Sequence, residues 1–202
     1  MSAYLTTAIA SYLLGTIPFG YLLVWVFRGE DVRSSGSGNI GATNVARKSP
    51  ALGVITLLLD AGKGLAAVAL TRELSGGEHH KFLMTVAAFC AIVGHLFPVW
   101  LKFHGGKGVA TSLGSFALIA PKSVVCMVGL FLLIVAATRY VSMGSVMAAA
   151  AFPVLAWDLH EYVEPRQLLV IALASLLVVW KHRQNIGRLI AGTEAKFGAK
   201  HG

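Results

Sequence analysis

The sequence predicts an all-α integral membrane protein with seven transmembrane helices. Of its 202 residues, 56% are hydrophobic and 13% are charged, and the mean hydropathy is +0.71. An ordinary soluble domain has roughly a quarter charged residues. Long apolar runs alternate with short polar segments, and a helix needs about 20 apolar residues to cross the hydrocarbon of a bilayer. This composition is therefore typical of a protein that spans a membrane several times.

The apolar runs divide into seven predicted spans, of which the first and fourth are irregular. The first is broken by Gly15 and Pro18. Pro121 and Lys122 split a later apolar stretch that is too long for one helix, and the short piece before them is expected to be tilted, half-inserted or re-entrant. The predicted spans are Tyr4–Phe27, Ala51–Thr71, Phe82–Leu101, Ser112–Ala120, Ser123–Ala137, Val141–Trp157 and Leu168–Trp180.

The distribution of Lys and Arg orients these spans. Cytoplasmic loops carry an excess of basic residues. Most Lys and Arg residues lie in the loops on one predicted side and in the C-terminal tail. The loops on the other side contain fewer Lys and Arg residues, and these are accompanied by acidic residues. We therefore expect the N-terminus outside and the C-terminus in the cytoplasm. The chain shows no internal repeat and no linker, so residues 1–202 are predicted to form a single membrane-embedded domain.

Two glycine-rich polar segments fall on the predicted cytoplasmic side: residues 37–44 (SGNIGATN) and residues 104–111 (HGGKGVAT). Glycines let backbone N–H groups turn toward a bound anion, so both segments are typical of a phosphate cradle. The alternative for the first segment is a flexible loop of turn-forming residues. That alternative does not explain the hydrogen-bonding side chains that alternate with the glycines beside Arg47, namely Ser37, Asn39, Thr43 and Asn44.

The second segment lacks the G-x-x-x-x-G-K-[ST] spacing of a nucleotide-binding P-loop. We therefore predict a general phosphate site made of backbone amides and the Lys107 ammonium group, with no nucleotide. His95 precedes the segment and is either a core histidine or part of the site.

Two ionisable residues, Asp60 and Lys63, lie inside the second span at i, i+3 spacing, on one face of the helix. Ionisable residues within a span are rare and usually face a bundle interior or a polar cavity. One interpretation is that the two neutralise each other and stabilise packing. The other is that Lys63 reaches the anionic site while Asp60 orients it.

A basic segment follows the last span. Lipid headgroups alone would account for its Lys and Arg residues. They do not account for His182 and Asn185, which share a helix face with Arg188. We expect this face to turn inward, and we expect Glu194 to pair with a nearby cation and hold the tail. The sequence shows no zinc-ligand spacing, and we expect no metal.

Three segments, in this order and spacing, resemble the bacterial acyl-phosphate:glycerol-3-phosphate acyltransferases, the PlsY type of membrane acyltransferase. They are GSGNIGATN at 36–44, GHLFP at 94–98 running on to GGKGVAT at 105–111, and H-x-x-N-I-x-R-L-x-x-G-x-E at 182–194. The runs YLLGTIPFG at 12–20 and LDAGKG at 59–64 are similar as well, so the resemblance covers essentially the whole chain.

The resemblance implies an enzyme of the bacterial inner membrane with its active site facing the cytoplasm. It would transfer a fatty acyl group from acyl phosphate to the 1-hydroxyl of sn-glycerol 3-phosphate, releasing lysophosphatidic acid and inorganic phosphate. This is the first acylation of phospholipid synthesis. The expected partners are these two substrates and the lipid bilayer. We expect no cofactor and no nucleic acid, and we expect the protein to act as a monomer.

On this resemblance, Ser37, His182 and Asn185 are predicted to be catalytic. A Ser37 acyl-enzyme is disfavoured, because no base is adjacent in sequence and acyl phosphate is already activated. The base is either His182 or the leaving phosphate, and we favour the substrate-assisted route. Substrate binding is assigned to Asn39, Thr43, Asn44, Arg47, Lys63, His95, Lys102, Gly105, Gly106, Lys107, Gly108, Thr111 and Arg188, and a structural role to Asp60 and Glu194.

Two other classes of protein remain open from the residues alone. A small transporter of anions or phosphate compounds would explain the spans, Lys63 and the phosphate cradles. It would not explain why the polar motifs fall on one side, because transporters place their sites near the midplane and usually show repeats. A lipid-binding scaffold without activity would explain the basic tail.

Overall fold

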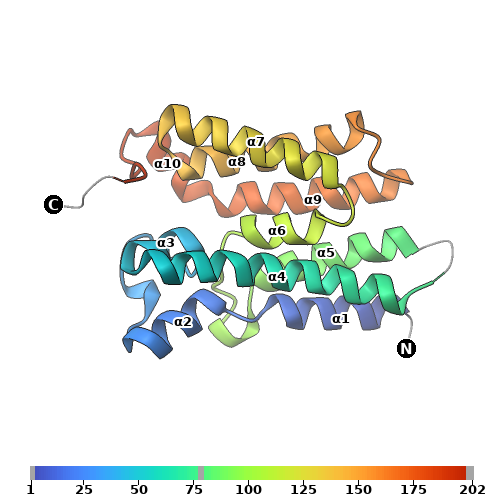
Figure 1. Cartoon of the computed structure of the whole chain (residues 1–202), viewed down its shortest axis with the longest axis horizontal. Coiled ribbons are helices and arrows are strands. Elements are labelled where there is room, and N and C mark those ends of the chain that lie inside the picture. The colour runs from blue at the N-terminus through green and yellow to red at the C-terminus, as the bar shows by residue number, and fades with distance from the viewer. Residues whose placement is uncertain (1–2, 77–79, 199–202) are drawn as a thin grey trace. The chain divides into compact units, whose positions relative to one another are not determined.

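The structure is a computed structural model that describes residues 3–76 and 80–198. Within these ranges the regular elements are all helical (Figure 1). The chain divides into two compact units, an N-terminal unit up to Ile119 and a C-terminal unit from Ala120 onward. The prediction of an all-α protein is confirmed for the described residues.

The N-terminal unit is built around α4 (Pro50–Leu74). Its helices are α1 (Ala3–Gly15), α2 (Phe19–Arg28), α3 (Ala42–Lys48), α4, α5 (His80–Leu96) and α6 (Val109–Phe116), with short 3-10 helices η1 (Val32–Ser34) and η2 (Val99–Leu101). Helices α1 and α2 follow each other end to end, and α4 runs beside both (Figure 1). Helices α3, α5 and α6 also pack on α4, so this helix contacts every other α-helix of the unit.

Local sequence explains where α4 begins and where α1 stops. Pro50 occupies the first turn of α4, where its missing N–H costs nothing, and the Ser49 side chain accepts a hydrogen bond from the Leu52 N–H. Helix α1 ends at Gly15, and Pro18 precedes α2. The predicted first span is therefore two helices in sequence, broken where Gly15 and Pro18 predicted the break.

The C-terminal unit contains α7 (Pro121–Thr138), α8 (Val141–Asp158), α9 (Pro165–Lys181) and α10 (Arg183–Ile190). Helix α8 packs against α7 and α9, and the short α10 contacts α8 and α9. Both α7 and α9 begin with proline. The Glu161 carboxylate, from the loop before α9, accepts hydrogen bonds from the N–H groups of Lys122 and Ser123, and it thereby caps the first turn of α7.

Among the residues that the structure describes, five helical segments of 18 residues or more are long and apolar enough to cross a membrane. They match the first, second, third, fifth and sixth predicted spans, and they are Ala3–Arg28, Pro50–Leu74, His80–Leu101, Pro121–Thr138 and Val141–Asp158. The seventh predicted span corresponds to α9, which has 17 residues. The total of seven spans and their orientation stay predictions.

The fourth predicted span, Ser112–Ala120, differs from the structure in its bounds. The helix there is α6, which begins at Val109 and has eight residues. Eight residues extend about 12 Å, which is less than half of the roughly 30 Å hydrocarbon thickness. The helix starts earlier than expected because Gly108, with φ of +86°, ends the preceding loop directly before Val109.

Candidate functional site

The first glycine-rich segment is organised by the buried side chain of Asn44, in α3. Its Nδ2 donates hydrogen bonds to the carbonyl oxygens of Val32, Ser35 and Asn39, at 3.0, 3.2 and 2.9 Å. Its Oδ1 accepts a hydrogen bond from the N–H of Ser37 at 2.9 Å. One amide group therefore holds four backbone positions of the loop. In this structure Asn44 acts on the loop itself, although the sequence placed it among the substrate ligands.

The loop held in this way and helix α3 present three of the predicted site residues outward. Ser37, Thr43 and Arg47 are exposed. The side chain of Asn39 is turned back, and its Oδ1 accepts a hydrogen bond from the N–H of Gly41 at 2.8 Å. The exposed side-chain groups here that can bind an anion are therefore the two hydroxyls and the guanidinium group.

The second glycine-rich segment lies on the end of α5. The N–H groups of Gly105 and Gly106 donate to the carbonyl oxygens of Leu96 and His95, at 3.3 and 3.1 Å. A methyl group at position 106 would overlap the His95 imidazole, and one at position 105 would overlap the His95 carbonyl oxygen. These glycines therefore allow the loop to pack on His95, and their N–H groups are already engaged. The sequence could not show that Gly105 and Gly106 pack on His95, because a glycine-rich pattern does not indicate whether a ligand or another part of the chain lies close to the glycines.

The groups suited to an anion lie at the end of this segment, in the first turn of α6. Gly108 turns the chain in the left-handed region, and the first N–H groups of α6 have no acceptor within the helix. The hydroxyls of Thr111 and Ser112 are buried and have no hydrogen-bond partner within the described structure. Buried polar groups are nearly always paired, so these hydroxyls point to a polar ligand or to water. Lys107 precedes this turn and is half-buried.

Three buried ionisable side chains connect α4 to α5. Lys63 Nζ lies 2.8 Å from Asp60 Oδ1, and it donates a hydrogen bond to the carbonyl oxygen of Ile17 at 2.7 Å. His95 Nδ1 lies 3.5 Å from the same Asp60 oxygen. The side chains of Asp60 and Lys63 are 3% and 1% exposed. The predicted pairing of Asp60 with Lys63 is present, and the contact with the first span at Ile17 was not foreseen.

In the C-terminal unit, His182 lies at the junction of α9 and α10 and is 2% exposed. Its Nδ1 lies 2.8 Å from the carbonyl oxygen of Val178. A carbonyl oxygen only accepts hydrogen bonds, so Nδ1 carries the proton here. In the neutral ring, Nε2 then carries the lone pair.

Glu194 gathers a second polar cluster in the same unit. Its Oε1 accepts hydrogen bonds from Ser142 Oγ and Asn185 Nδ2, each at 2.6 Å, and its Oε2 lies 2.6 Å from Arg188 Nε. Burial by itself would raise the pKa of the Glu194 carboxyl, but these hydrogen bonds outweigh it and hold the pKa below its ordinary value. The carboxylate thus ties the tail to α8 and α10, as expected. Ser142 was missed, because a serine near the start of a helix carries no distinguishing pattern.

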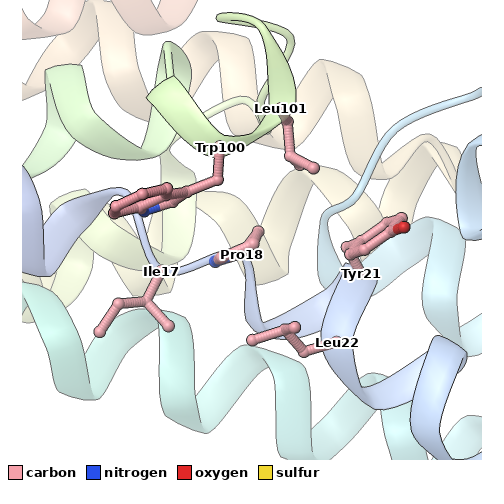
Figure 2. A pocket seen from close by; sticks show the side chains of 6 residues that line it. All are labelled: Ile17, Pro18, Tyr21, Leu22, Trp100 and Leu101. Atoms are coloured by element: carbon pink, nitrogen blue, oxygen red, sulfur yellow. The ribbon is translucent and has the colours of Figure 1, made fainter.

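An apolar groove of about 370 Å³ opens beside the break in the first span (Figure 2). The chain between α1 and α2 forms one side, α2 forms another, and η2 contributes a tryptophan and a leucine. The indole N–H of Trp100 donates to Thr16 Oγ1 at 2.9 Å, and this bond fixes the ring over the break. None of these residues was predicted as part of a site, although the proline inside the first span signalled the irregularity. The lining residues are Ile17, Pro18, Tyr21, Leu22, Trp100 and Leu101.

The structure thus groups the predicted residues within each unit. In the N-terminal unit, Asp60, Lys63 and His95 form one cluster with the Gly105–Gly106 turn, and Asn44 organises the first loop. Lys102 is exposed and has a φ of +50° at the end of η2. In the C-terminal unit, Asn185, Arg188 and Glu194 form one cluster, and His182 lies one turn before Asn185.

Comparison with known proteins identifies the chain. A family model described as glycerol-3-phosphate acyltransferase matches residues 5–192. The glycerol-3-phosphate acyltransferase of Trichlorobacter lovleyi is 46% identical over 200 residues, which cover 98% of this chain and 100% of that protein. Glycerol-3-phosphate acyltransferase 1 of Rhizobium johnstonii is 45% identical over 197 residues, covering 97% and 92%.

Solved structures agree with the sequence matches. The glycerol 3-phosphate form of PlsY (YgiH), an integral membrane glycerol 3-phosphate acyltransferase, has a TM-score of 0.89 and 32% identity, and the match covers 98% of this chain and 96% of that one. Its lysophosphatidic acid form has a TM-score of 0.85 and 31% identity. The helical fold and these matches together define an integral membrane acyltransferase. The chain belongs to the glycerol-3-phosphate acyltransferase family.

Proposed function

We propose that this acyltransferase uses acyl phosphate as its donor and transfers the acyl group directly to the 1-hydroxyl of sn-glycerol 3-phosphate. The hydroxyl oxygen attacks the acyl carbonyl carbon, the bond from that carbon to the phosphate oxygen breaks, and the departing phosphate takes the hydroxyl proton. The products are lysophosphatidic acid and inorganic phosphate. Family membership over residues 5–192 is the observation that carries this proposal.

The chemistry fits the residues present. An acyl phosphate is activated before it binds, so the enzyme has to position two phosphorylated substrates and stabilise negative charge. No histidine, aspartate or glutamate of the described chain hydrogen-bonds the Ser37 hydroxyl. This supports direct transfer over a seryl intermediate. We assign phosphate binding to Lys107, the first turn of α6 and Thr111, with Ser37, Thr43, Arg47, Lys102 and Arg188 as further substrate ligands.

The decisive experiment supplies purified protein with acyl phosphate and glycerol 3-phosphate alone. We expect lysophosphatidic acid and inorganic phosphate in equal amounts, and no product when acyl-coenzyme A or the acyl thioester of acyl carrier protein replaces the donor. Product with either replacement and none with acyl phosphate would overturn the proposed donor. The family match does not favour the transporter, and uptake of glycerol 3-phosphate into proteoliposomes tests it directly.

We also propose that residues 1–202 form one multi-pass domain of the bacterial inner membrane with seven spans, acting as a monomer, with its substrate site on the cytoplasmic side. The excess of Lys and Arg in the loops and tail of one predicted side supports this orientation.

Single cysteines test the orientation. In a variant with Cys90 and Cys126 replaced by alanine, cysteine at Gly76 or Glu164 should react with an impermeant thiol reagent in intact cells. Cysteine at Lys196 should react only after the membrane is permeabilised, because the tail is cytoplasmic in this topology. The reverse pattern would show that the predicted orientation is wrong.

We propose that the groove beside Pro18 and Trp100 holds the acyl chain of the donor. Its lining is apolar, and its volume is in the range of small-molecule sites. Replacing Leu22 with tryptophan should fill part of it. Exclusion of about two methylenes, at about 0.8 kcal/mol each, should raise the KM for a long-chain acyl phosphate about tenfold. The KM for a short-chain donor should change little.

The matched control for the groove is Val26→Trp, which places the same indole side chain on α2 at an exposed position outside the lining. It should leave both KM values near those of the unmodified protein. Equal effects of Leu22→Trp on long and short donors would place the acyl chain elsewhere.

A further inference from the structure

We propose that Asp60 and Lys63 are positioning residues, which hold the second glycine-rich segment in place through His95 and do not contact substrate. The inference rests on the proposed role of this segment in phosphate binding. It revises the prediction that Lys63 is a substrate ligand, because the structure gives its ammonium group a different set of partners.

The Lys63 ammonium group points toward the break between α1 and α2. It bonds to the carbonyl oxygen of Ile17 and pairs with Asp60, at 2.7 and 2.8 Å, and it lies 5.6 Å from the centre of the Phe19 ring. The Ile17 carbonyl belongs to the break between α1 and α2, where Pro18 interrupts regular helix bonding. Lys63 therefore adds a second hydrogen bond to a carbonyl group at the helix break, which also accepts the N–H of Phe19 at 3.1 Å. With its side chain 1% exposed, it is enclosed by protein.

Asp60 is connected to the second glycine-rich segment through the His95 imidazole. Asp60 Oδ1 faces His95 Nδ1 at 3.5 Å, and the opposite edge of the same ring, at Nε2, lies against Gly106 so closely that a methyl group there would overlap it. The His95 carbonyl oxygen also accepts the Gly106 N–H bond. The orientation of the imidazole thus determines where the Gly105–Gly106 turn can lie. Asp60 is the acidic group that orients this imidazole.

Helix α4 also contacts the chain at the far end of the segment. Gly64 is so close to α6 that a methyl group on it would overlap the Thr111 carbonyl oxygen, and one on Gly114 would overlap the Ala61 carbonyl oxygen. Helices α4 and α6 therefore pack backbone to backbone directly after Gly108. The segment from Gly105 to Gly108 is held at one end by the Asp60–His95 contact and at the other by this packing.

Through these contacts, α4 determines the positions of Lys107 and of the first turn of α6. A bound phosphate needs donors held within about 0.5 Å of their productive positions, and a supporting shell of side chains provides this. Replacing Asp60 or Lys63 should therefore weaken phosphate binding, although neither side chain contacts the phosphate.

The test uses three variants of the full-length protein in detergent: Lys63→Met, Asp60→Asn, and the two combined. Each single change leaves a buried charge without its partner and should lower the unfolding temperature, whereas the double variant removes both charges and should recover most of it. In all three, amide hydrogen exchange of a peptide covering residues 102–110 should be faster by about tenfold or more. The KM for glycerol 3-phosphate or acyl phosphate should rise by a similar factor, with a smaller change in kcat.

Thr71→Val is the matched control, because it removes a buried hydroxyl from the same helix without touching the cluster. Exchange of the 102–110 peptide at the unmodified rate in the double variant would overturn the proposal. A raised KM with unchanged exchange would instead identify Lys63 as a substrate ligand. Lys107→Ala tests the proposed phosphate site separately from the positioning role of Asp60 and Lys63. If this variant leaves the KM values of both substrates unchanged, the assignment of the phosphate site is wrong. The exchange rates of the 102–110 peptide would still decide whether α4 positions the segment.

Discussion

Replacing Asn44 with alanine should lower kcat/KM for glycerol 3-phosphate by about a hundredfold or more, the loss expected when substrate-positioning groups move by about 1 Å. The change removes one side-chain amide that holds four backbone groups of the first loop. Buried groups left without a partner cost about 1–3 kcal/mol each, so the loop should shift to reach water. Ser37 and Arg47, which the loop and α3 present, would then lose their positions. Steady-state kinetics with both substrates measures the effect.

Two further variants show whether the loss comes from the loop. Asn44→Asp keeps an oxygen for the Ser37 N–H but turns three donor contacts into repulsion between oxygens, so it should be at least as damaging as alanine. Ser34→Ala removes one exposed hydroxyl from the same segment and should leave kcat/KM near normal. Unchanged kinetics in Asn44→Ala would exclude the first loop from the substrate site.

The helices followed from the sequence because each apolar run is one local feature. Lipid-spanning segments have to satisfy their backbone internally, so a run of sufficient length predicts a helix without knowledge of its neighbours. The break at Pro18 was equally local, since proline lacks the N–H and clashes with the preceding turn. The start of α6 was misplaced by three residues, because apolarity marked Ser112 while the backbone angle of Gly108 sets the true start.

The roles of individual side chains were harder to predict from the sequence, because they depend on contacts between residues that are distant in the chain. Motif composition brought Asn44 and Lys63 to attention as polar groups in unusual places. It could not show that the Asn44 amide faces the carbonyl of Val32, or that Lys63 bonds a carbonyl group 46 positions earlier in the chain. Pairings within a few residues were accessible, as with Asp60 and Lys63 or Arg188 and Glu194. A polar residue in a motif can hold the site as well as touch the substrate, and only the contacts distinguish the two.

The choice of base can be decided at His182, whose Nδ1 is engaged with the Val178 carbonyl and whose Nε2 therefore carries the lone pair. A general base contributes about 10²–10⁴ in kcat, so His182→Ala should lose that much if the imidazole takes the hydroxyl proton. The pH–rate profile should then lose its acidic limb. Alternatively, the leaving phosphate takes the proton and His182 only orients a substrate group. A side chain with a hydrogen-bonding atom at the position of the imidazole nitrogen should then retain much of kcat.

Glutamine and asparagine separate these outcomes, because their amide groups reach different ring positions. Glutamine places a hydrogen-bonding atom near Nε2, and asparagine can only replace the Nδ1 bond to Val178. Substrate assistance predicts that His182→Gln keeps far more kcat than His182→Ala, that His182→Asn falls between them, and that the acidic limb persists in all three. Gln184→Ala, at an exposed position of α10, is the control and should be near normal. Equal losses of kcat in the glutamine and alanine variants, together with loss of the acidic limb of the pH–rate profile, would show that His182 is the base. Near-normal kinetics in His182→Ala would show that His182 is not part of the site.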